Sequence, residues 1–345
     1  MKALAKIRPG FGNVQIIDLP EPSCEDGQVK VEVKFSGICG TDLHIYHDTF
    51  KSYPPVIMGH EFSGIVAEVG RGVRHVREGD RVTVLPSTAV TCGECDYCRQ
   101  GFYMFCPSRR GMGHGVHGSF TKYAVVREDM VRKIPDFLTL EEAALSEPLA
   151  CAVQPIEELT SLHVGDQVLL SGPGPIGLLC LSLLIARGCK VIVAGTTADK
   201  GRLRLAEQMG ADVVVDVLTE NLDDVLKRET NGRGVDAAVE CAGAGASIAS
   251  CLKALKPRGK YMQVGIVGRE ITIDFDLVLY KQIELCGSLA HSMSSWEKVM
   301  SIWEQRKLNL KPLITHTLPL SSWEKAFEIC EQKQGGKVLL YYDYD

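Results

Sequence analysis

Four cysteines lie within fifteen residues of one another, and their spacing is typical of a metal site. They form C-x2-C-x2-C-x7-C in the segment TCGECDYCRQGFYMFC and are Cys92, Cys95, Cys98 and Cys106. Two-residue gaps turn successive sulfurs toward one centre, and the longer gap returns the fourth sulfur to close a tetrahedron. Four thiolates would fill every position around zinc, so this site would be structural. A cluster of redox-active thiols and a zinc ribbon for nucleic acid are the alternatives, disfavoured by the spacing and by the acidic net charge.

A second set of possible metal ligands surrounds these cysteines in the sequence. Cys39 lies in SGICGTDLH, His60 and Glu61 lie in MGHEFSG, and Glu147 lies in LSEPLA. Thiolate, imidazole and carboxylate all bind zinc, and a mixed set with one open position is what a catalytic zinc needs. Each residue alone has an ordinary explanation, such as a buried thiol or a helix-start carboxylate. Their joint occurrence indicates a second, catalytic zinc.

A glycine pattern predicts a dinucleotide site. Gly172, Gly174 and Gly177 form G-x-G-x-x-G in SGPGPIG, with Pro175 and Ile176 between the last two glycines. The pattern follows a strand-like run at 167–171 and opens an apolar helical stretch at 176–186, which is the context the motif requires. The first glycine permits a tight turn, the second lets the backbone approach a pyrophosphate, and the helix N-terminus favours the negative charge.

Hydrophobic periodicity predicts two kinds of architecture. Apolar residues alternate with charged ones from Val29 to Phe35, and β-rich runs follow at 62–69 and 81–85, so the N-terminal part is predicted to be an irregular β-rich domain. Helical stretches such as 202–209 alternate with six strand-like runs, which predicts a doubly wound parallel sheet. The six runs are 167–171, 190–194, 212–216, 235–241, 260–264 and 284–288. The last 55 or so residues, with a helical pattern at 296–303, are expected to complete the first domain.

Bulk composition excludes several classes of protein. The chain has 345 residues, a formal net charge of -5 and no block of basic residues, which disfavours nucleic acid or anionic lipid as a partner. No run reaches the roughly 18 apolar residues of a membrane span, and the start MKALAKIRPGFG lacks the apolar core of a signal peptide. The thirteen cysteines are odd in number and partly clustered, which favours metal over disulfides. A cytoplasmic location is expected.

Taken together, these motifs resemble the zinc-containing medium-chain alcohol dehydrogenase family. GICGTDLHIY, GHEFSGIVAEVG, EGDRV, CGECDYCRQG, SEPLACAV and SGPGPIG occur in the family's order and spacing, from about residue 2 to residue 340. Glu147 stands where other alcohol dehydrogenases carry a second cysteine, which is similar to the polyol (sorbitol-like) and L-threonine dehydrogenase branch. The resemblance implies an α/β protein with a GroES-like catalytic domain at 1–153 and 290–345 and a doubly wound Rossmann domain at 154–289.

The resemblance also implies an activity and residue roles. The chain would transfer a hydride between NAD or NADP and a secondary alcohol: a polyol, a sugar derivative or an amino alcohol such as L-threonine. Cys39, His60 and Glu61 would bind the catalytic zinc, Glu147 would either bind it or hold its water, and a second zinc would occupy the four-cysteine site. Thr41 and His44 would relay the proton to solvent. The alternative is a non-catalytic NAD(P)-binding member that keeps only the structural zinc, but retention of all these residues favours the enzyme.

Residues near the end of the second strand of the parallel sheet determine whether such a protein binds NAD or NADP. NAD-specific proteins place an acidic residue there against the ribose, whereas this chain has Gly195-Thr196-Thr197. This favours NADP, whose 2′-phosphate Thr196, Thr197, Lys200 or Arg202 would bind; the alternative is that Asp199 takes the ribose role. Val264 and Gly265 end a later strand where the family's backbone approaches the nicotinamide.

Substrate and assembly are less constrained. The family pattern implies a pocket lined by Thr41, Ile45, His60, Phe120, Glu147 and a segment with Ala290, His291 and Trp296. Sorbitol-type relatives carry an arginine near the position of Ala290, and its absence disfavours sorbitol. Arg109 and Arg110 would either bind a phosphorylated polyol or form a solvated surface. The strand-like stretch Ile271–Leu279 lies where the family joins subunits, which predicts a homodimer or homotetramer.

Overall fold

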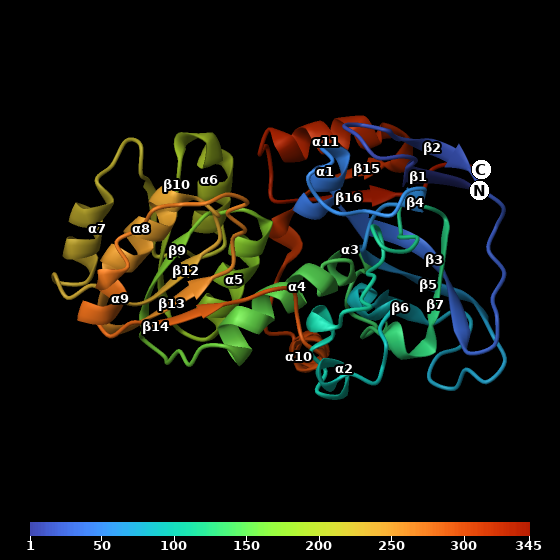
Figure 1. Cartoon of the computed structure of the whole chain (residues 1–345), viewed down its shortest axis with the longest axis horizontal. Coiled ribbons are helices and arrows are strands. Elements are labelled where there is room, and N and C mark those ends of the chain that lie inside the picture. The colour runs from blue at the N-terminus through green and yellow to red at the C-terminus, as the bar shows by residue number, and fades with distance from the viewer.

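A computed structural model describes residues 1–345 and shows two lobes joined at a narrow waist (Figure 1). One lobe, drawn mainly in blue, cyan and red, contains both chain ends. The other lobe, drawn in green to orange, is formed by the middle of the chain. The chain therefore begins in one lobe, builds the second and returns to the first.

The lobe that holds both termini is built on β-sheet, as the alternating pattern predicted. Its larger sheet has seven strands in the order β15-β16-β3-β5-β6-β8, with β7 also paired to β3, and its smaller sheet has the order β2-β1-β4. The strands are β1 (Lys2–Lys6), β2 (Val14–Asp18), β3 (Gln28–Gly37), β4 (Val56–Ile57), β5 (Glu61–Val69), β6 (Arg81–Val84), β7 (Tyr123–Arg127), β8 (Val131–Lys133), β15 (Ile314–Pro319) and β16 (Lys337–Tyr341). The pairing of β16 with β3 shows that the C-terminal segment completes this lobe.

Short helices connect these strands and carry the polar motifs. The helices are α1 (Gly40–Tyr46), α2 (Asp96–Arg99), α3 (Leu140–Ala143), α4 (Ser146–Val153), α10 (Met293–Glu304) and α11 (Trp323–Glu331). The helical pattern expected at 296–303 is the middle of α10. A 3-10 turn, η1 (Pro86–Thr88), and a π-helical turn, η4 (Gln154–Glu158), complete the segments that matter for the site.

The second lobe is the doubly wound sheet that the sequence predicted. Six parallel strands run in the order β11-β10-β9-β12-β13-β14. They are β9 (Gln167–Ser171), β10 (Lys190–Gly195), β11 (Val213–Asp216), β12 (Val235–Glu240), β13 (Leu255–Gln263) and β14 (Glu284–Gly287), and the helices are α5 (Pro175–Ala186), α6 (Lys200–Gln208), α7 (Leu222–Glu229), α8 (Gly245–Ala254) and α9 (Asp276–Tyr280). The order reverses beside β9, so the ends of β9 and β12 form the switch point where such sheets bind ligands.

Strand alternation in β9 explains why helices cover both faces of this sheet. Val168 and Leu170 join a core cluster that includes side chains of α5 and α6, whereas Leu169 joins a cluster with side chains of α7 and α8. Successive strand residues point to opposite faces, so a continuous apolar run needs a cover on each face.

Helices α4 and α10 lie at the waist between the lobes (Figure 1). Almost every residue of α4, SEPLACAV, is buried, and the helix packs against α5 of the other lobe and against α10. The largest core cluster accordingly includes Leu149 of α4, Leu178 of α5 and Trp303 of α10. Glu147 enters the junction because α4 carries it there.

One predicted element differs from the structure. The stretch Ile271–Leu279 was expected to be strand-like, but residues 271–275 form no regular element and α9 occupies Asp276–Tyr280. Alternation of apolar and polar residues was misleading here, because these side chains do not pair with a neighbouring strand. The open edge of the parallel sheet is β14 instead.

Candidate zinc and dinucleotide sites

The four clustered cysteines surround one centre. All four sulfurs lie within 4.8 Å of one another. The Sγ atom of Cys92 is 3.9 Å from that of Cys98 and 3.7 Å from that of Cys106. A tetrahedron with Zn–S bonds of about 2.3 Å has edges of about 3.8 Å, so the four residues fit a closed zinc site.

Backbone N–H groups prepare these sulfurs for metal. The amide of Cys95 donates to Cys92 Sγ at 3.3 Å, that of Cys98 donates to Cys95 Sγ at 3.4 Å, and that of Cys92 donates to Cys106 Sγ at 3.4 Å. Hydrogen bonds from the backbone of Cys95 and Glu94 lower the pKa of Cys92 to about 7. Donors of this kind stabilise thiolate, which is the form that binds zinc.

Strand pairing assembles the second group of ligands. Side-chain donor atoms of Cys39, His60 and Glu61 all lie within 4.8 Å of one another. Gly37, at the end of β3, pairs with Glu61, the first residue of β5, so Cys39 lies close to Glu61 although 22 residues separate them. A Cβ on Gly37 would lie 2.2 Å from Glu61 Oε2, which explains the glycine at this position.

Unsatisfied polar atoms mark this group as a metal site. Five buried side-chain nitrogen or oxygen atoms make no regular hydrogen bond, and three of them are His60 Nδ1 and the two carboxylate oxygens of Glu61. Buried polar groups are normally paired, so such a concentration needs an explanation. A divalent cation among Cys39, His60 and Glu61 would satisfy His60 Nδ1 and Glu61 Oε1, while Lys337 already pairs with Glu61 Oε2, and the residues therefore fit zinc.

Two buried charged residues support these ligands, and the sequence analysis identified neither. Asp42 is fully buried and accepts hydrogen bonds from the backbone N–H of Cys39 at 2.9 Å and of Gly59 at 3.2 Å. Its Oδ1 lies 3.9 Å from His60 Nδ1, which places a buried carboxylate beside the imidazole but leaves this nitrogen without a hydrogen bond. The signal was present, since Asp42 lies in the motif CGTDLH.

The second supporting residue is Lys337 of β16, which is 2% exposed and forms an ion pair with Glu61. Burial alone would lower the pKa of Lys337, but Glu61 and Cys39 raise it above its ordinary value. The ammonium group therefore stays charged and fixes the carboxylate. Lys337 lies 276 residues from Glu61 in a short strand, and nothing local distinguishes it from a surface lysine.

Glu147 lies in a neighbouring group and not in the first one. Its carboxylate shares a space with Cys151 Sγ and His291 Nε2, each 3.7 Å from its Oε1. Burial raises the pKa of Glu147, but His291 and His60 together bring it down to about 2. His60 is among the groups that lower this pKa, and both His60 and Glu147 are largely buried. Cys151, four residues after Glu147 on α4, was missed although helical spacing brings it to the same face.

The two residues expected to relay a proton lie on α1 but share no hydrogen bond. His44 is exposed, and its Nδ1 lies 3.1 Å from Thr49 Oγ1. No hydrogen bond joins Thr41 to His44, so a relay between them needs a bridging hydroxyl group.

The glycine loop has the shape of a phosphate cradle. Gly172 has φ of +98°, and a Cβ there would lie 2.5 Å from the backbone nitrogen of Ala242. A Cβ on Gly177 would lie 2.0 Å from the Gly172 carbonyl oxygen, whereas one on Gly174 would meet nothing within 4 Å. Gly172 and Gly177 thus have no space for a side chain, whereas the backbone of Gly174, the N-cap of α5, is open to a ligand. Pro175 and Ile176 begin α5, and the missing N–H of proline costs nothing there.

A buried carboxylate that the sequence analysis missed holds the floor of this loop. Glu240, at the end of β12, accepts hydrogen bonds from the N–H groups of Ala242 and Gly243, both at 3.0 Å, and from Ser247 Oγ at 2.7 Å. The backbone N–H groups of Val264 and Gly265 both donate to the Glu240 carbonyl oxygen at 2.8 Å. Val264 and Gly265 therefore lie beside the switch point, where they were expected.

No free carboxylate lies at the end of β10. Asp199 Oδ2 accepts hydrogen bonds from Thr196, at 3.2 Å from its backbone N–H and at 2.8 Å from its hydroxyl, and Oδ1 lies 3.2 Å from Lys333 Nζ. Thr197 Oγ1 donates to Asp216 at 2.6 Å. Asp199 is therefore occupied by its own turn, which disfavours the alternative that it holds the ribose.

Two residues expected to bind the cofactor, Arg202 and Gly195, make contacts that the sequence did not show. Arg202 is 8% exposed, and its Nε donates to the Gly335 carbonyl oxygen at 2.7 Å, so this side chain lies against the C-terminal segment. The sequence does not show this contact of α6 with the returning chain. Gly195 is the last residue of β10, and a Cβ there would lie 3.0 Å from the ring of Pro173, so Gly195 lies against the glycine loop.

The structure corrects part of the expected substrate pocket. Ile45, Phe120 and Trp296 are at most 1% exposed and pack in core clusters, so they line no open surface. The Trp296 ring stacks on His291 at 5.8 Å and supports it. Ala290 has φ of +53° beside that histidine.

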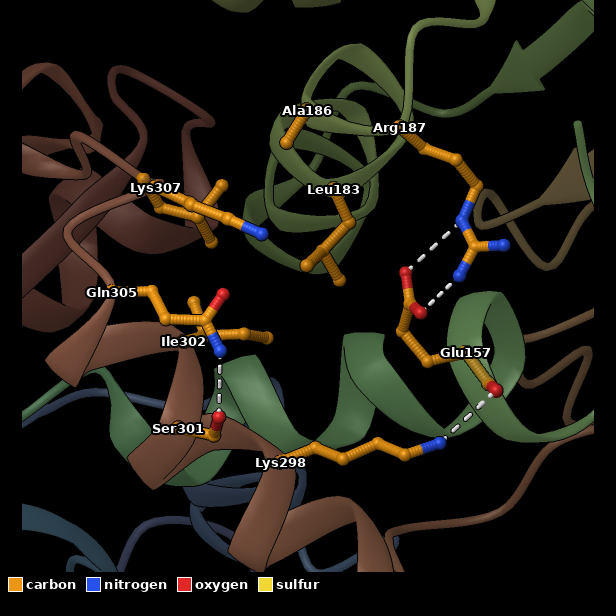
Figure 2. A pocket seen from close by; sticks show the side chains of 10 residues that line it. Glu157, Leu183, Ala186, Arg187, Lys298, Ser301, Ile302, Gln305 and Lys307 are labelled. Carbon is orange, nitrogen blue, oxygen red and sulfur yellow. Dashed lines mark hydrogen bonds and ion pairs between the residues drawn. The ribbon is translucent and has the colours of Figure 1, made fainter. Parts of the chain in front are cut away.

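Figure 2 shows a different pocket, of about 350 Å³, behind the junction between α5, η4 and α10. Arg187 and Glu157 form an ion pair in it, Lys298 Nζ donates to the Glu157 carbonyl oxygen at 3.3 Å, and Gln305 donates to Ser301 at 2.9 Å. Its charged groups are thus largely satisfied by one another. No candidate metal group lies in it, so the site is the region around Glu61 and Glu147.

Comparison with protein families matches both lobes. Residues 25–136 match the alcohol dehydrogenase GroES-like domain, and residues 175–305 match the zinc-binding dehydrogenase domain. The chain is 38% identical to D-arabitol-phosphate dehydrogenase of Enterococcus avium (93% of this chain, 91% of the relative) and 38% identical to sorbitol dehydrogenase of Halalkalibacterium halodurans (92% of each). It is 36% identical to L-threonine 3-dehydrogenase of Pyrococcus horikoshii (92% and 91%).

Solved structures agree over almost the whole chain. A zinc-binding dehydrogenase from Sinorhizobium meliloti bound to NADP has 28% identity and a TM-score of 0.88, covering 99% of this chain and 98% of that one. An alcohol dehydrogenase from Escherichia coli complexed with NADH has 28% identity and a TM-score of 0.88, covering 99% of both chains.

The fold and the two candidate zinc sites define a zinc-dependent, nicotinamide-linked oxidoreductase. The chain belongs to the zinc-containing medium-chain alcohol dehydrogenase family, in its polyol and L-threonine dehydrogenase branch. It is therefore an enzyme that transfers a hydride between a secondary alcohol and NAD(P), and the non-catalytic alternative is disfavoured. None of its helices is both long and apolar enough to span a bilayer.

Proposed function

We propose that Cys39, His60 and Glu61 hold the catalytic zinc, with Glu147 facing the open side of the site. The support is the shared position of the three donor atoms and the unsatisfied atoms of His60 and Glu61. Zinc in such a site supplies Lewis-acid catalysis, which makes a bound alcohol more acidic. Glu147 is held by His291 and Cys151, so its role in this proposal is to hold the water or the substrate hydroxyl opposite the ligands.

In this proposal the residues of the chain orient the zinc ligands and transfer the proton. Asp42 places a buried carboxylate beside the His60 ring, and Lys337 pairs with the Glu61 carboxylate, which favours one geometry for Glu61. Helix α4 packs on α5, whose N-terminus bears the glycine loop, so the metal group and the dinucleotide cradle both belong to the junction. Thr41 would accept the substrate's hydroxyl proton while passing its own proton through a bridging hydroxyl group to His44, which would release it to solvent.

The function that this geometry supports best is oxidation of a secondary alcohol group on a polyol, a sugar derivative or an amino alcohol. The observation that carries it is the three-ligand group with unsatisfied buried atoms at the junction that also holds the glycine loop. A panel of polyols, phosphorylated polyols and L-threonine, assayed with NAD and with NADP on zinc-loaded enzyme, tests the proposal. Reduction of either cofactor by one of these alcohols supports it, and no reduction by any of them contradicts it.

For the cofactor, we propose a preference for NADP. Thr196 stands where NAD-specific proteins place a carboxylate, and Asp199 is already bonded to Thr196 and Lys333. We expect Thr196→Asp to lower kcat/KM for NADP about 10-fold relative to NAD, because a carboxylate there repels the 2′-phosphate. Steady-state kinetics with both cofactors measures the ratio.

The matched control is Thr196→Val, which removes the hydroxyl without adding a charge. It should leave the NADP to NAD ratio closer to that of the wild type than Thr196→Asp does. A wild-type enzyme that prefers NAD, or equal effects of both substitutions on the ratio, would contradict the assignment.

We also propose that two copies associate through the open edge of the parallel sheet. The segments before and after β14 carry the exposed apolar side chains Phe275, Leu279, Tyr280 and Leu289, with Leu279 and Tyr280 exposed by 70% and 79%. An unpaired strand edge flanked by exposed apolar side chains is typical of an interface. We expect the wild type to sediment as a dimer or a tetramer and Leu279→Asp to shift it toward monomer. A monomeric wild type at micromolar concentration would overturn this surface.

Two further assignments accompany the proposal. The catalytic domain would comprise residues 1–153 and 290–345, and the Rossmann domain residues 154–289, in agreement with the strand order of the two large sheets. A cytoplasmic location would suit the chemistry, because the four-cysteine site and Cys39 need reduced thiols. All thirteen cysteines are free of disulfides.

A further inference from the structure

Arg109 presents a guanidinium group with unused hydrogen-bond donors. It lies three residues after Cys106 and is half-buried. Its Nε donates to the Ser87 carbonyl oxygen at 3.3 Å, and the structure gives its two terminal nitrogens no hydrogen bond and no carboxylate within 4 Å. A half-buried guanidinium without an anion is costly unless a ligand supplies one.

Ser87 connects this guanidinium to the proposed metal site. The Ser87 hydroxyl lies 3.5 Å from His291 Nε2, and the same nitrogen lies 3.7 Å from Glu147 Oε1. Burial lowers the pKa of Arg109, and Glu147 and Cys151 are the groups that oppose this shift. Arg109 is therefore one residue removed from the side chains around the reacting centre.

Other basic groups gather around Tyr53, whose backbone N–H donates to the carbonyl oxygen of His114 at 2.8 Å. The Arg110 guanidinium stacks on the Tyr53 ring at 4.5 Å, and Lys51 Nζ lies 5.3 Å from the same ring. A Cβ on Gly111 would lie 2.7 Å from His114 Nε2 and 3.6 Å from a terminal nitrogen of Arg109, so this glycine leaves open the space that the two side chains share. None of Lys51, Arg109 and Arg110 forms an ion pair within the chain, whereas Lys30, Arg132 and Arg187 each pair with a glutamate.

We propose that Arg109, assisted by Arg110 and Lys51, binds the phosphate of a phosphorylated polyol whose hydroxyl lies at the zinc. This inference rests on the proposed function and names the substrate class of that site. A guanidinium fork binds phosphate oxygens in pairs, which makes arginine suited to recognise a phosphate ester. The carboxylate of an amino alcohol carries a single charge, which Arg109 alone would balance. Two further unpaired cations fit the dianionic phosphate better.

The test compares each phosphorylated polyol with its parent. We expect kcat/KM of wild-type, zinc-loaded enzyme to be about 10- to 100-fold higher for D-arabitol phosphate or galactitol 1-phosphate than for D-arabitol or galactitol, as charged hydrogen bonds allow. Arg109→Ala should remove this preference by lowering the value for the phosphorylated compound alone, and Arg109→Lys should restore part of it. The matched control is Arg77→Ala, at an 86% exposed surface arginine, which should leave both values unchanged.

Calorimetric binding of galactitol 1-phosphate and D-arabitol phosphate to wild type and Arg109→Ala provides a readout independent of turnover, and melting curves of both variants confirm that they fold. Oxidation of the parent polyols or of L-threonine without a phosphate preference would overturn the inference while the proposed function stands. Equal affinity of wild type and Arg109→Ala for both phosphorylated compounds would overturn it as well. If no alcohol is oxidised, the proposed function fails, and loss of binding on Arg109→Ala would then still support a phosphate site.

Discussion

Cys39→Ser is expected to abolish alcohol oxidation while the protein stays folded. We expect turnover to fall by about 1,000-fold or more, because Lewis-acid stabilisation by a catalytic metal is worth several kcal/mol. The zinc content should fall from two ions to one per chain. Because Cys39 belongs to none of the core clusters, the melting temperature should change by no more than about 3 °C, which corresponds to about 1 kcal/mol. Steady-state assays, metal analysis and thermal melts measure the three effects.

The control for this variant is Cys24→Ser. Cys24 lies outside every candidate metal group, and its Sγ contacts only backbone carbonyl oxygens. It should retain two zinc ions and wild-type turnover. Full activity of Cys39→Ser with two bound zinc ions would show that Cys39 is not a ligand.

Cys98→Ser is expected to act on stability first. The segment 92–106 has one short helix and one 3-10 turn. Its stability therefore depends on the bound metal and not on a hydrophobic core. We expect the melting temperature to fall by on the order of 10 °C, because loss of a structural zinc removes several kcal/mol. Protein that remains folded should keep its catalytic zinc, and limited proteolysis should cut first within residues 92–106.

The two cysteine variants separate the two metals. If Cys39→Ser and Cys98→Ser lowered turnover, zinc content and melting temperature to the same extent, the division into a structural and a catalytic zinc would be wrong. Arg77→Ala, at an exposed site, gives the change in melting temperature that a surface substitution alone produces.

Local patterns were sufficient for most of the fold. Strand alternation at 29–35 and the apolar runs of the parallel sheet predicted β3 and β9 to β14, because the period of side chains follows from backbone geometry. Periodicity predicted β13 too short, as the strand begins at Leu255, and it predicted a strand at Ile271–Leu279 where α9 lies. Short, half-exposed segments depend on their neighbours, and their period alone does not decide the structure.

Site residues were predictable where they belong to a motif and were missed where they are brought in by tertiary structure. Cys39, His60 and Glu61 come together through the pairing of β3 with β5, and the motifs pointed to all three. Lys337 reaches Glu61 only because β16 joins β3 in the sheet. The contact of Arg202 with Gly335 was missed for the same reason, because Gly335 lies in the returning C-terminal segment.

Anomalous diffraction from a crystal of the zinc-loaded enzyme, measured on both sides of the zinc absorption edge, would locate each zinc ion. Two anomalous peaks per chain are expected, one among Cys92, Cys95, Cys98 and Cys106 and the other within bonding distance of Cys39, His60 and Glu61. The second peak should keep a coordination position open toward Glu147. Density for a single zinc among the four clustered cysteines, with Glu61 bound only to Lys337, would show that Cys39, His60 and Glu61 hold no catalytic zinc.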